Sequence, residues 1–269
     1  MTSLWVLGSG SGGNCCAVEA DGATVLIDAG FTAKEVERRA ERVALDLSRL
    51  SAIVLTHEHG DHAAGAGRLA RRFRVPVVTA TGTWASIQRR MRGAEHRPLG
   101  LCARVEVGPF VIQGCPTSHD AADPLAVVVR LADGTCVGVA YDLGRATLAV
   151  RYLLRDLTAL VLEANHDDVL LRTSGYPASV QRRIAGSAGH LSNRAAAELL
   201  GELYHPGLGV VVLAHLSRRC NTPDDARATV AAALARAGFA GTLHVAGQDE
   251  PLGPLSVLPP AGAQLGLLL

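Results

Sequence analysis

The chain is poor in aromatic residues and in lysine. Phe, Trp and Tyr together make up 4% of its 269 residues, and Lys34 is the single lysine among 26 basic residues. Positive charge is therefore carried almost entirely by arginine, whose fixed fork of donors suits phosphate oxygens. Acidic residues nearly balance it, giving a net charge of +1 at pH 7. This charge does not mark a protein that binds nucleic acid through bulk positive charge.

The sequence also lacks the patterns of membrane and secreted proteins. No run approaches the roughly 18 apolar residues that a membrane span needs. The N-terminus, Met1 to Gly8, has no basic region followed by a long apolar segment. The six cysteines include no Cys-x-x-Cys pair, so we expect most of them to be reduced core residues. A cytoplasmic protein with no membrane partner is the expectation.

Hydrophobic residues are abundant, at 48%, which is enough for a sizeable core. Short β-like runs such as Thr24 to Ile27 and Phe110 to Gln113 occur beside helical periodicity such as Ala33 to Arg42 and Pro223 to Ala237. Strands first outnumber helices and the two then alternate, which favours an α/β fold with sheets covered by helices. No long Pro-, Gly- or Ser-rich linker divides the chain, so we expect one domain over residues 1–269.

The most informative segment is Thr56 to His62, which reads Thr-His-Glu-His-Gly-Asp-His and follows an apolar, strand-like run. His57 and His59 are two residues apart, so both side chains point the same way from an extended strand end. Asp61 and His62 follow where the chain turns into a helix-like run. Imidazole nitrogen and carboxylate oxygen are ligands for zinc, manganese and iron(II). One short corner can therefore supply ligands to two adjacent metal ions.

The spacing His-x-His-x-Asp-His resembles the signature of the metallo-β-lactamase superfamily of metallohydrolases. This resemblance implies an αββα sandwich, in which two mixed β-sheets are flanked by helices and the metal site lies along their shared edge. A weak internal repeat fits two such halves. Each has a strand, an Asp-x-Gly turn, a helix and a second strand, and the turns are Asp28 to Gly30 and Asp142 to Gly144.

The resemblance further implies two divalent metal ions per chain, zinc or manganese. His119, Asp142 and His215 each follow a later strand-like run, where the superfamily supplies its remaining ligands. By the resemblance, the first ion is bound by His57, His59 and His119, the second by Asp61, His62 and His215, and both by a bridging Asp142. Asp61 is also expected to take part in catalysis. Asp28 is expected to orient the histidine corner rather than to bind metal.

Two segments of the second half resemble the phosphodiesterase branch of the superfamily, which includes the tRNA 3′-processing endonucleases. In that branch a strand-end glutamate orients a histidine that protonates the leaving oxygen, and the resemblance assigns these roles to Glu163 and His190. The alternative is that Ser192 or Asn193 caps the following helix and His190 merely precedes it.

Over nearly its whole length the chain resembles the YycJ/WalJ-type subgroup, whose members are implicated as 5′ to 3′ exonucleases on double-stranded DNA, linked to mismatch repair. The resemblance implies a nucleic-acid substrate and favours DNA over RNA. The matching segments are Gly8 to Asn14, Thr56 to His62, Thr117 to Ala121, Asp142 to Gly144, Glu163 to Asp167, Tyr176-Pro177 with Arg182 to Ile184, Gly189 to Asn193 and Ala214 to Ser217. Gly13, Gly60 and Ala164 depart from the subgroup's usual residues, but none of them is an expected ligand.

Candidate substrate contacts lie near these motifs. Arg182, Arg183 and Arg218 are placed to contact a nucleic-acid backbone, with solvated helix surface as the alternative. Asn14, in the Gly-rich opening, is a further candidate, with a tight β-turn as the alternative. Two other functions stay open: a small-molecule hydrolase acting on a thioester, lactone or cyclic phosphodiester, and a non-catalytic metal-dependent regulator. Exo- against endonuclease action, and a homo-oligomer against a monomer, also stay open.

Overall fold

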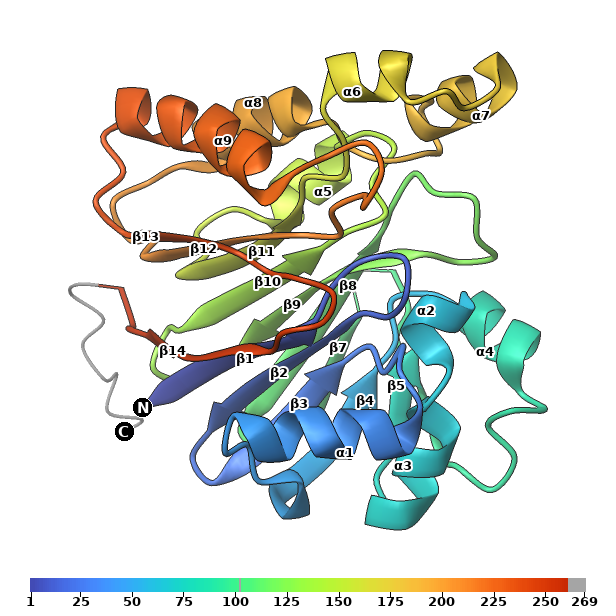
Figure 1. The fold of residues 1–269 in the computed structure, drawn as a ribbon. Helices are drawn as coiled ribbons and strands as arrows, with labels where there is room; N and C mark the ends of the chain where they lie inside the picture. The colour runs from blue at the N-terminus through green and yellow to red at the C-terminus, as the bar shows by residue number, and fades with distance from the viewer. Residues whose placement is uncertain (102, 261–269) are drawn as a thin grey trace.

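Two β-sheets pack face to face in the computed structural model, which describes residues 1–101 and 103–260 (Figure 1). Seven strands form the first sheet, in the order β14-β1-β2-β3-β4-β5-β6. These strands are β1 (Thr2–Gly8), β2 (Cys15–Ala20), β3 (Ala23–Ile27), β4 (Leu50–Val54), β5 (Val77–Thr79), β6 (His96–Pro98) and β14 (Leu252–Val257). Seven strands also form the second sheet, in the order β13-β12-β11-β10-β9-β8-β7. These are β7 (Arg104–Val107), β8 (Phe110–Pro116), β9 (Leu125–Arg130), β10 (Cys136–Ala140), β11 (Ala159–Glu163), β12 (Val210–Ala214) and β13 (Thr242–Val245).

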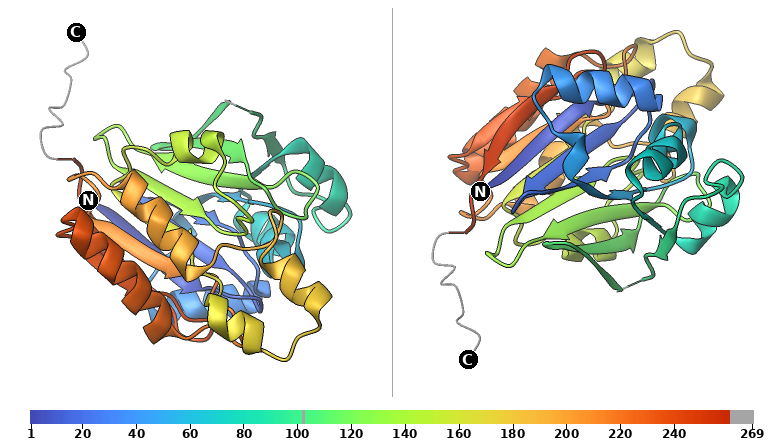
Figure 2. Two further views of the ribbon diagram at one scale, coloured as in Figure 1. Left: turned by 90° about the horizontal axis from the view of Figure 1, so that it is seen from above. Right: turned by 90° about the horizontal axis from the view of Figure 1, so that it is seen from below.

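Helices cover the outer face of each sheet, and Figure 2 shows the two covered faces from opposite sides. On the first sheet lie α1 (Ala33–Arg42) and α3 (Ala66–Phe73), with α2 (Gly60–Ala63), α4 (Thr81–Ile87) and the 3₁₀ turn Leu47–Arg49 beside them. On the second sheet lie α5 (Leu148–Leu153), α8 (Asn193–Leu203) and α9 (Pro223–Ala237), and α6 (Asp168–Thr173) and α7 (Ala178–Ile184) lie at its margin. The predicted sandwich of two mixed sheets flanked by helices is confirmed.

Alternating strand residues build three apolar layers. In β3, Val25 and Ile27 face the layer between the sheets, whereas Leu26 faces the helices. In β11, Val161 points between the sheets and Leu160 faces the helices that cover the second sheet. Successive side chains of a strand point to opposite faces, so a strand covered on both sides is apolar throughout. This explains the continuous apolar runs of the sequence.

The two longest helices of the second half are bounded by residues suited to helix ends. Thr222 precedes α9 and its side chain accepts a hydrogen bond from the backbone of Asp225 at 3.1 Å, and α9 ends at Gly238, whose φ is 83°. Ser192 precedes α8 and accepts from the backbone of Ala195 at 3.2 Å. Such caps satisfy amide groups that the helix itself leaves unpaired. Ser192 therefore does cap the helix after His190, as one interpretation of the sequence held.

Each sheet is parallel in one half. The pairs β3–β4, β4–β5 and β5–β6 are parallel, and so are β10–β11, β11–β12 and β12–β13. The carboxyl ends of neighbouring parallel strands meet at the same edge of a sheet. In both sheets this edge holds the polar segments that the sequence singled out, so the fold brings two distant parts of the chain together.

Several short elements were not anticipated from the sequence. Strands β13 and β14 are only partly buried, and helices α5, α6 and α7 have six or seven residues, too few for a clear helical period. The expected burial of cysteine holds for Cys15, Cys16, Cys115, Cys136 and Cys220, while Cys102 lies outside the described residues. Within residues 1–101 and 103–260, no helix has the length and apolar character needed to cross a membrane.

Candidate metal centre

A cavity of about 300 Å³ opens at the edge where the two sheets meet. Its lining comes from the loops after β1, β4, β8, β10 and β12, from the end of α7 and from the segment before α8. The lining residues are Ser11, His59, Asp61, His119, Asp120, Asp142, Arg183, Ile184, Ala188, Gly189, His190 and His215. All the lining residues that can bind metal belong to the set anticipated from the sequence, except Asp120.

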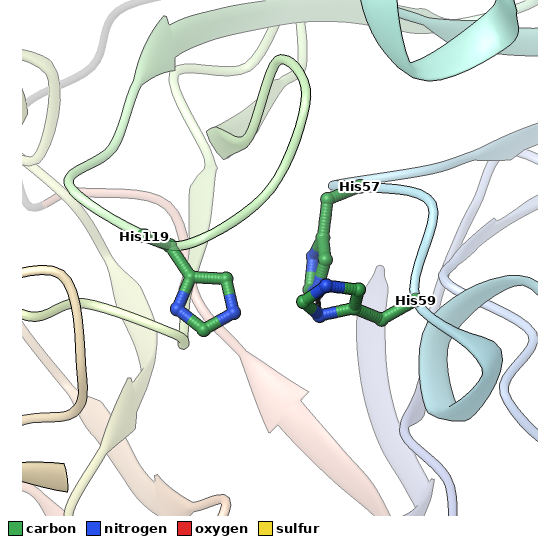
Figure 3. Close-up of side chains that lie close together, drawn as sticks. All are labelled: His57, His59 and His119. Carbon is green, nitrogen blue, oxygen red and sulfur yellow. Dashed lines mark hydrogen bonds between the residues drawn. The ribbon is translucent and has the colours of Figure 1, made fainter. Parts of the chain in front are cut away.

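Three imidazoles face one another at one end of the cavity, as Figure 3 shows. His57 and His59 leave the loop after β4, and His119 reaches toward them from the loop after β8. One nitrogen of each lies within 4.8 Å of the others, and His57 Nε2 is 3.0 Å from His59 Nδ1. Burial, together with the charge of His62, holds the pKa of His57 well below its usual range. A neutral imidazole is the form that binds metal.

A second group of three residues that could hold a metal ion lies beside the first. Asp61, His62 and His215 offer atoms within 4.8 Å of one another. Asp61 Oδ2 is 3.5 Å from His62 Nε2 and 3.8 Å from His215 Nε2. The Nε2 atom of His215 is buried and has no hydrogen-bond partner among the described residues. A buried polar atom without a partner is costly, so this ring nitrogen is suited to bind a metal ion.

Asp142 lies between the two groups. Its Oδ2 is 2.9 Å from His62 Nε2 and 3.5 Å from His57 Nε2, and its Oδ1 is 4.0 Å from His119 Nε2. Asp142 has a φ of 56° and His215 has the same value, a left-handed conformation that is uncommon for residues other than glycine but that aspartate and histidine adopt more readily than most.

Asp28 is fully buried behind the histidine corner. Its Oδ2 lies 2.7 Å from His62 Nδ1, and its Oδ1 accepts a hydrogen bond from the backbone of Thr56 at 2.8 Å. Burial by itself lowers the pKa of His62, but the carboxylates of Asp28 and Asp142 outweigh it and raise that pKa well above its usual range. Asp28 therefore fixes the orientation of the His62 ring and leaves Nε2 toward Asp142.

Glu163, at the end of β11, holds two histidines at once. Its Oε1 lies 2.8 Å from His190 Nδ1 and 3.0 Å from His215 Nδ1. Its Oε2 accepts hydrogen bonds from the backbone of Leu143 at 2.8 Å and of Leu191 at 3.0 Å. Both oxygens of this buried carboxylate thus have two hydrogen-bond partners each, and these contacts position the His190 and His215 rings. The ring nitrogens that remain, Nε2 of both histidines, are turned away from Glu163.

His190 lines the cavity and keeps 19% of its side chain exposed. Burial lowers its pKa, but Glu163 and Asp142 more than reverse this effect and raise the pKa to about 10. The imidazole can therefore carry a proton at neutral pH and present it to a molecule in the cavity.

Asn14 does not face the cavity, contrary to the expected substrate contact. The side chain is fully buried, and its Oδ1 accepts hydrogen bonds from Ser9 Oγ and from the backbone of Gly10, both at 2.9 Å. Its Nδ2 lies 3.1 Å from His62 Nε2. The chain is here a compact loop closed by Asn14, so its amide has no room to meet a substrate.

The three candidate arginines occupy different environments. Arg183 lines the cavity, and Arg182 is exposed beside it on α7. Arg218 instead forms an ion pair with Asp249 at 2.7 Å. The structure thus places Arg183 at the site, Arg182 next to it, and Arg218 in a surface pair.

Two supporting residues were missed by sequence reasoning. Ser9 Oγ accepts a hydrogen bond from the backbone of His215 at 2.8 Å, and so ties the last histidine to the N-terminal loop. Gln248 Oε1 accepts from Gly12 and its Nε2 donates to Gly13 at 2.9 Å. The contacts of both residues could not be predicted from the sequence, because each acts on a part of the chain more than 200 positions away.

The donor set fits divalent metal. It combines imidazoles with carboxylates, it contains a buried ring nitrogen without a partner in the described chain, and the ligand atoms within each group lie within 4.8 Å of one another. A match to the family model described as "Metallo-beta-lactamase superfamily" covers residues 8–134.

Relatives match over a longer stretch. The chain is 31% identical over 237 residues to the exodeoxyribonuclease YycJ of Bacillus anthracis, covering 87% of this chain and 89% of the relative. It is 28% identical to the exodeoxyribonuclease WalJ of Streptococcus pneumoniae, covering 86% and 88%. Among solved structures, the metallo-β-lactamase fold protein YhfI from Bacillus subtilis superposes with a TM-score of 0.69 at 18% identity, over 93% of this chain and 98% of that one.

Fold, site and relatives together define a metal-dependent hydrolase. The chain belongs to the metallo-β-lactamase superfamily, in which its similarity is to the YycJ and WalJ proteins. The resemblance stated from the sequence, and the expectation of an enzyme that uses divalent metal, are confirmed.

Proposed function

We propose that the protein is a metal-dependent phosphodiesterase that removes nucleotides from the 5′ end of double-stranded DNA. The observation that carries this proposal is the Glu163–His190 pair at 2.8 Å, set beside two groups of metal ligands. An alkoxide is a poor leaving group, so cleavage of a phosphodiester gains about 10²–10⁴ in rate from a positioned acid. The relatives named exodeoxyribonucleases favour DNA as the polymer.

The ligand assignment follows from the two groups. His57, His59 and His119 would hold one divalent ion, Asp61, His62 and His215 a second, and Asp142 would contact both. When bound, a pair of zinc or manganese ions supplies a nucleophile near neutral pH and neutralises phosphate charge. Asp28 orients His62, so that its Nε2 stays available as a ligand.

His190 is the residue that we assign to proton delivery. Its Nδ1 is held by Glu163, which fixes the ring and leaves Nε2 to donate to the departing oxygen. Asp61, which is 27% exposed and lines the cavity, is both ligand and part of the reaction centre. A role in DNA repair, a cytoplasmic location and one catalytic domain over residues 1–269 belong to the same proposal.

The test is degradation of 5′-phosphorylated double-stranded DNA and of matched RNA, labelled at either end, by protein loaded with Mn²⁺ or Zn²⁺. We expect DNA products that shorten from the 5′ end, and their loss in His59→Ala and His190→Ala. Metal content of the variants, measured in parallel, separates the two causes, because His190→Ala should keep its metal. Cleavage of RNA alone would make the protein an RNA-processing nuclease.

If fully metallated protein cleaves neither polymer, a small-molecule phosphodiester becomes the leading substrate. The cavity of about 300 Å³ is at the small end of ligand pockets and would accept one. Hydrolysis of bis(p-nitrophenyl) phosphate therefore belongs in the same experiment.

A further inference from the structure

Helix α7 is an unusual element of this fold, because none of its residues is buried. It lies with α6 at the margin of the molecule, away from the sheets (Figure 2). Its last turn carries Arg182 and Arg183, and Arg183 also lines the catalytic cavity. A short helix that buries no apolar face gains little from packing, so its charge and position suggest a binding role.

The two arginines of α7 have no acidic partner within the described parts of the chain, in contrast to Arg218 and Arg194. Arg218 forms an ion pair with Asp249 at 2.7 Å, and Arg194 forms one with Glu198 at 2.9 Å. Such pairs neutralise much of the local charge. No neighbouring carboxylate in the described chain offsets the charge of the Arg182 and Arg183 guanidinium groups, which lie beside the cavity where a polyanion would contact them.

The end of α7 is joined directly to His190. The backbone N–H of His190 donates to the carbonyl of Ile184 at 2.8 Å, and that of Gly189 donates to Gly186 at 2.9 Å. The turn is so tight that a Cβ at Gly189 would lie 2.2 Å from the carbonyl oxygens of Arg183 and Ile184. A shift of α7 must therefore move the backbone of His190.

The same turn also contacts the metal-ligand loops. The hydroxyl of Ser118 donates to the carbonyl of Ser187, and the carbonyl of Gly189 lies 3.4 Å from His119 Nδ1. The backbone of Gly144 in turn donates to the carbonyl of Ser118 at 2.8 Å. Residues 178–189, here called the α7 arm, thus connect an exposed pair of cations to both halves of the reaction centre.

We propose that the α7 arm binds the DNA backbone outside the scissile bond, and that its occupation positions His190. This inference rests on the proposed function and adds a second contact region to it. Because contacts to remote parts of a substrate can support orientation at the reacting centre, loss of the arm should lower turnover as well as affinity.

The test compares wild-type protein with the double variant Arg182→Ala/Arg183→Ala. Arg236→Ala is the matched control, since Arg236 is an exposed arginine in the last turn of another helix, α9. DNA binding is measured as a function of salt, and kcat and KM are measured on DNA and on bis(p-nitrophenyl) phosphate. We expect the slope of log affinity against log salt to fall by about two in the double variant, roughly one per lost phosphate contact.

Turnover of DNA should fall more than turnover of the small diester, which cannot reach the arm. Arg182→Lys/Arg183→Lys should recover the salt slope, because lysine keeps the charge. An unchanged salt slope, or a rise in KM with kcat on DNA intact, would overturn the inference. Absence of DNA cleavage by the wild type would instead count against the proposed function, so the two failures are distinguishable.

Discussion

The two Asp-x-Gly turns share one backbone geometry, but their aspartates lie in different environments. Asp28 follows β3 with a φ of 61°, and Asp142 follows β10 with a φ of 56°. Each turn leads to a helix whose first residue is preceded by a capping threonine, Thr32 before α1 and Thr147 before α5. Asp28, however, is sealed behind His62, whereas Asp142 lines the cavity. In the proposed metal centre, Asp28 therefore orients the ligand His62, whereas Asp142 is itself a ligand.

The glycines of the two turns also match. A Cβ at Gly30 would lie 1.7 Å from the carbonyl oxygen of Asp61, and one at Gly144 would lie 2.1 Å from that of Ser187. Each glycine therefore lets a loop of the site approach closely, the histidine corner in one half and the His190 turn in the other. The comparison indicates that Gly30 admits the histidine corner, whereas Gly144 admits the turn that precedes the proposed acid, His190.

The largest expected difference between the halves is in Asp142→Asn. Asp142 contacts imidazoles of both ligand groups, so the variant should lose bound metal and hydrolysis together. Its loss should exceed the roughly 10–100-fold cost typical of removing a residue that only supports a ligand. Metal content and hydrolysis of bis(p-nitrophenyl) phosphate are the measurements. Full metal content in Asp142→Asn would contradict its assignment as the bridging ligand.

Asp28→Asn should have a smaller effect, because the carboxylate acts through His62. We expect a loss of about 10–100-fold in metal affinity or activity. Saturating Mn²⁺ or Zn²⁺ should restore much of the activity of Asp28→Asn, whereas Asp142→Asn should not respond. An equal response of both variants to added metal would mean that Asp28 and Asp142 have the same role. The proposed difference between an orienting carboxylate and a ligand would then be wrong.

Gly30→Ala and Gly144→Ala test whether the close approach of a neighbouring loop to each glycine is needed for the site. Both place a methyl group against a backbone carbonyl, and overpacking of this kind costs about 1–3 kcal/mol in unfolding free energy. Gly30→Ala should also reduce metal content, since it displaces Asp61. Gly144→Ala should keep its metal and lower turnover, since it displaces the turn before His190. Urea unfolding and metal analysis distinguish these outcomes, and equal metal loss in both would remove the proposed division.

The turns also show how far the sequence could predict the structure. The spacing within Thr56 to His62 sufficed to predict that these side chains lie together, because the residues of the histidine corner are close in the chain. The positions of His119, Asp142 and His215 depended on a resemblance, because their approach depends on how the sheets pair. The enclosure of Asn14 could not be predicted, since it results from Ser9, Gly10 and His62 converging on one amide.

The smallest expected difference lies in the helices that follow the turns. Only α1 has an acidic residue in its first turn, Glu35, whereas α5 has none. The hydrogen bonds from Arg38 lower the pKa of Glu35 most strongly. Partial burial opposes this shift and a hydrogen bond from Arg39 adds to it, so that the pKa is about 2. The unfolded value is roughly 4.3, so the folded pKa is depressed. The pair therefore stabilises the protein above about pH 4.3, and this stabilisation is lost as the pH falls toward 2.

Glu35→Gln should accordingly lower the free energy of unfolding by about 1 kcal/mol or less at pH 7, because pairs near the surface contribute little. The measurement is urea unfolding between neutral pH and the lowest pH at which the protein folds. The difference in unfolding free energy between Glu35→Gln and wild type should shrink as the pH falls below about 4.3. Glu41→Gln is the control, an exposed position of the same helix without an ion pair in the described chain. A Glu35→Gln deficit that stayed constant with pH would assign the effect to packing of the side chain. In that case α1 and α5 would differ in length and burial but not in electrostatics.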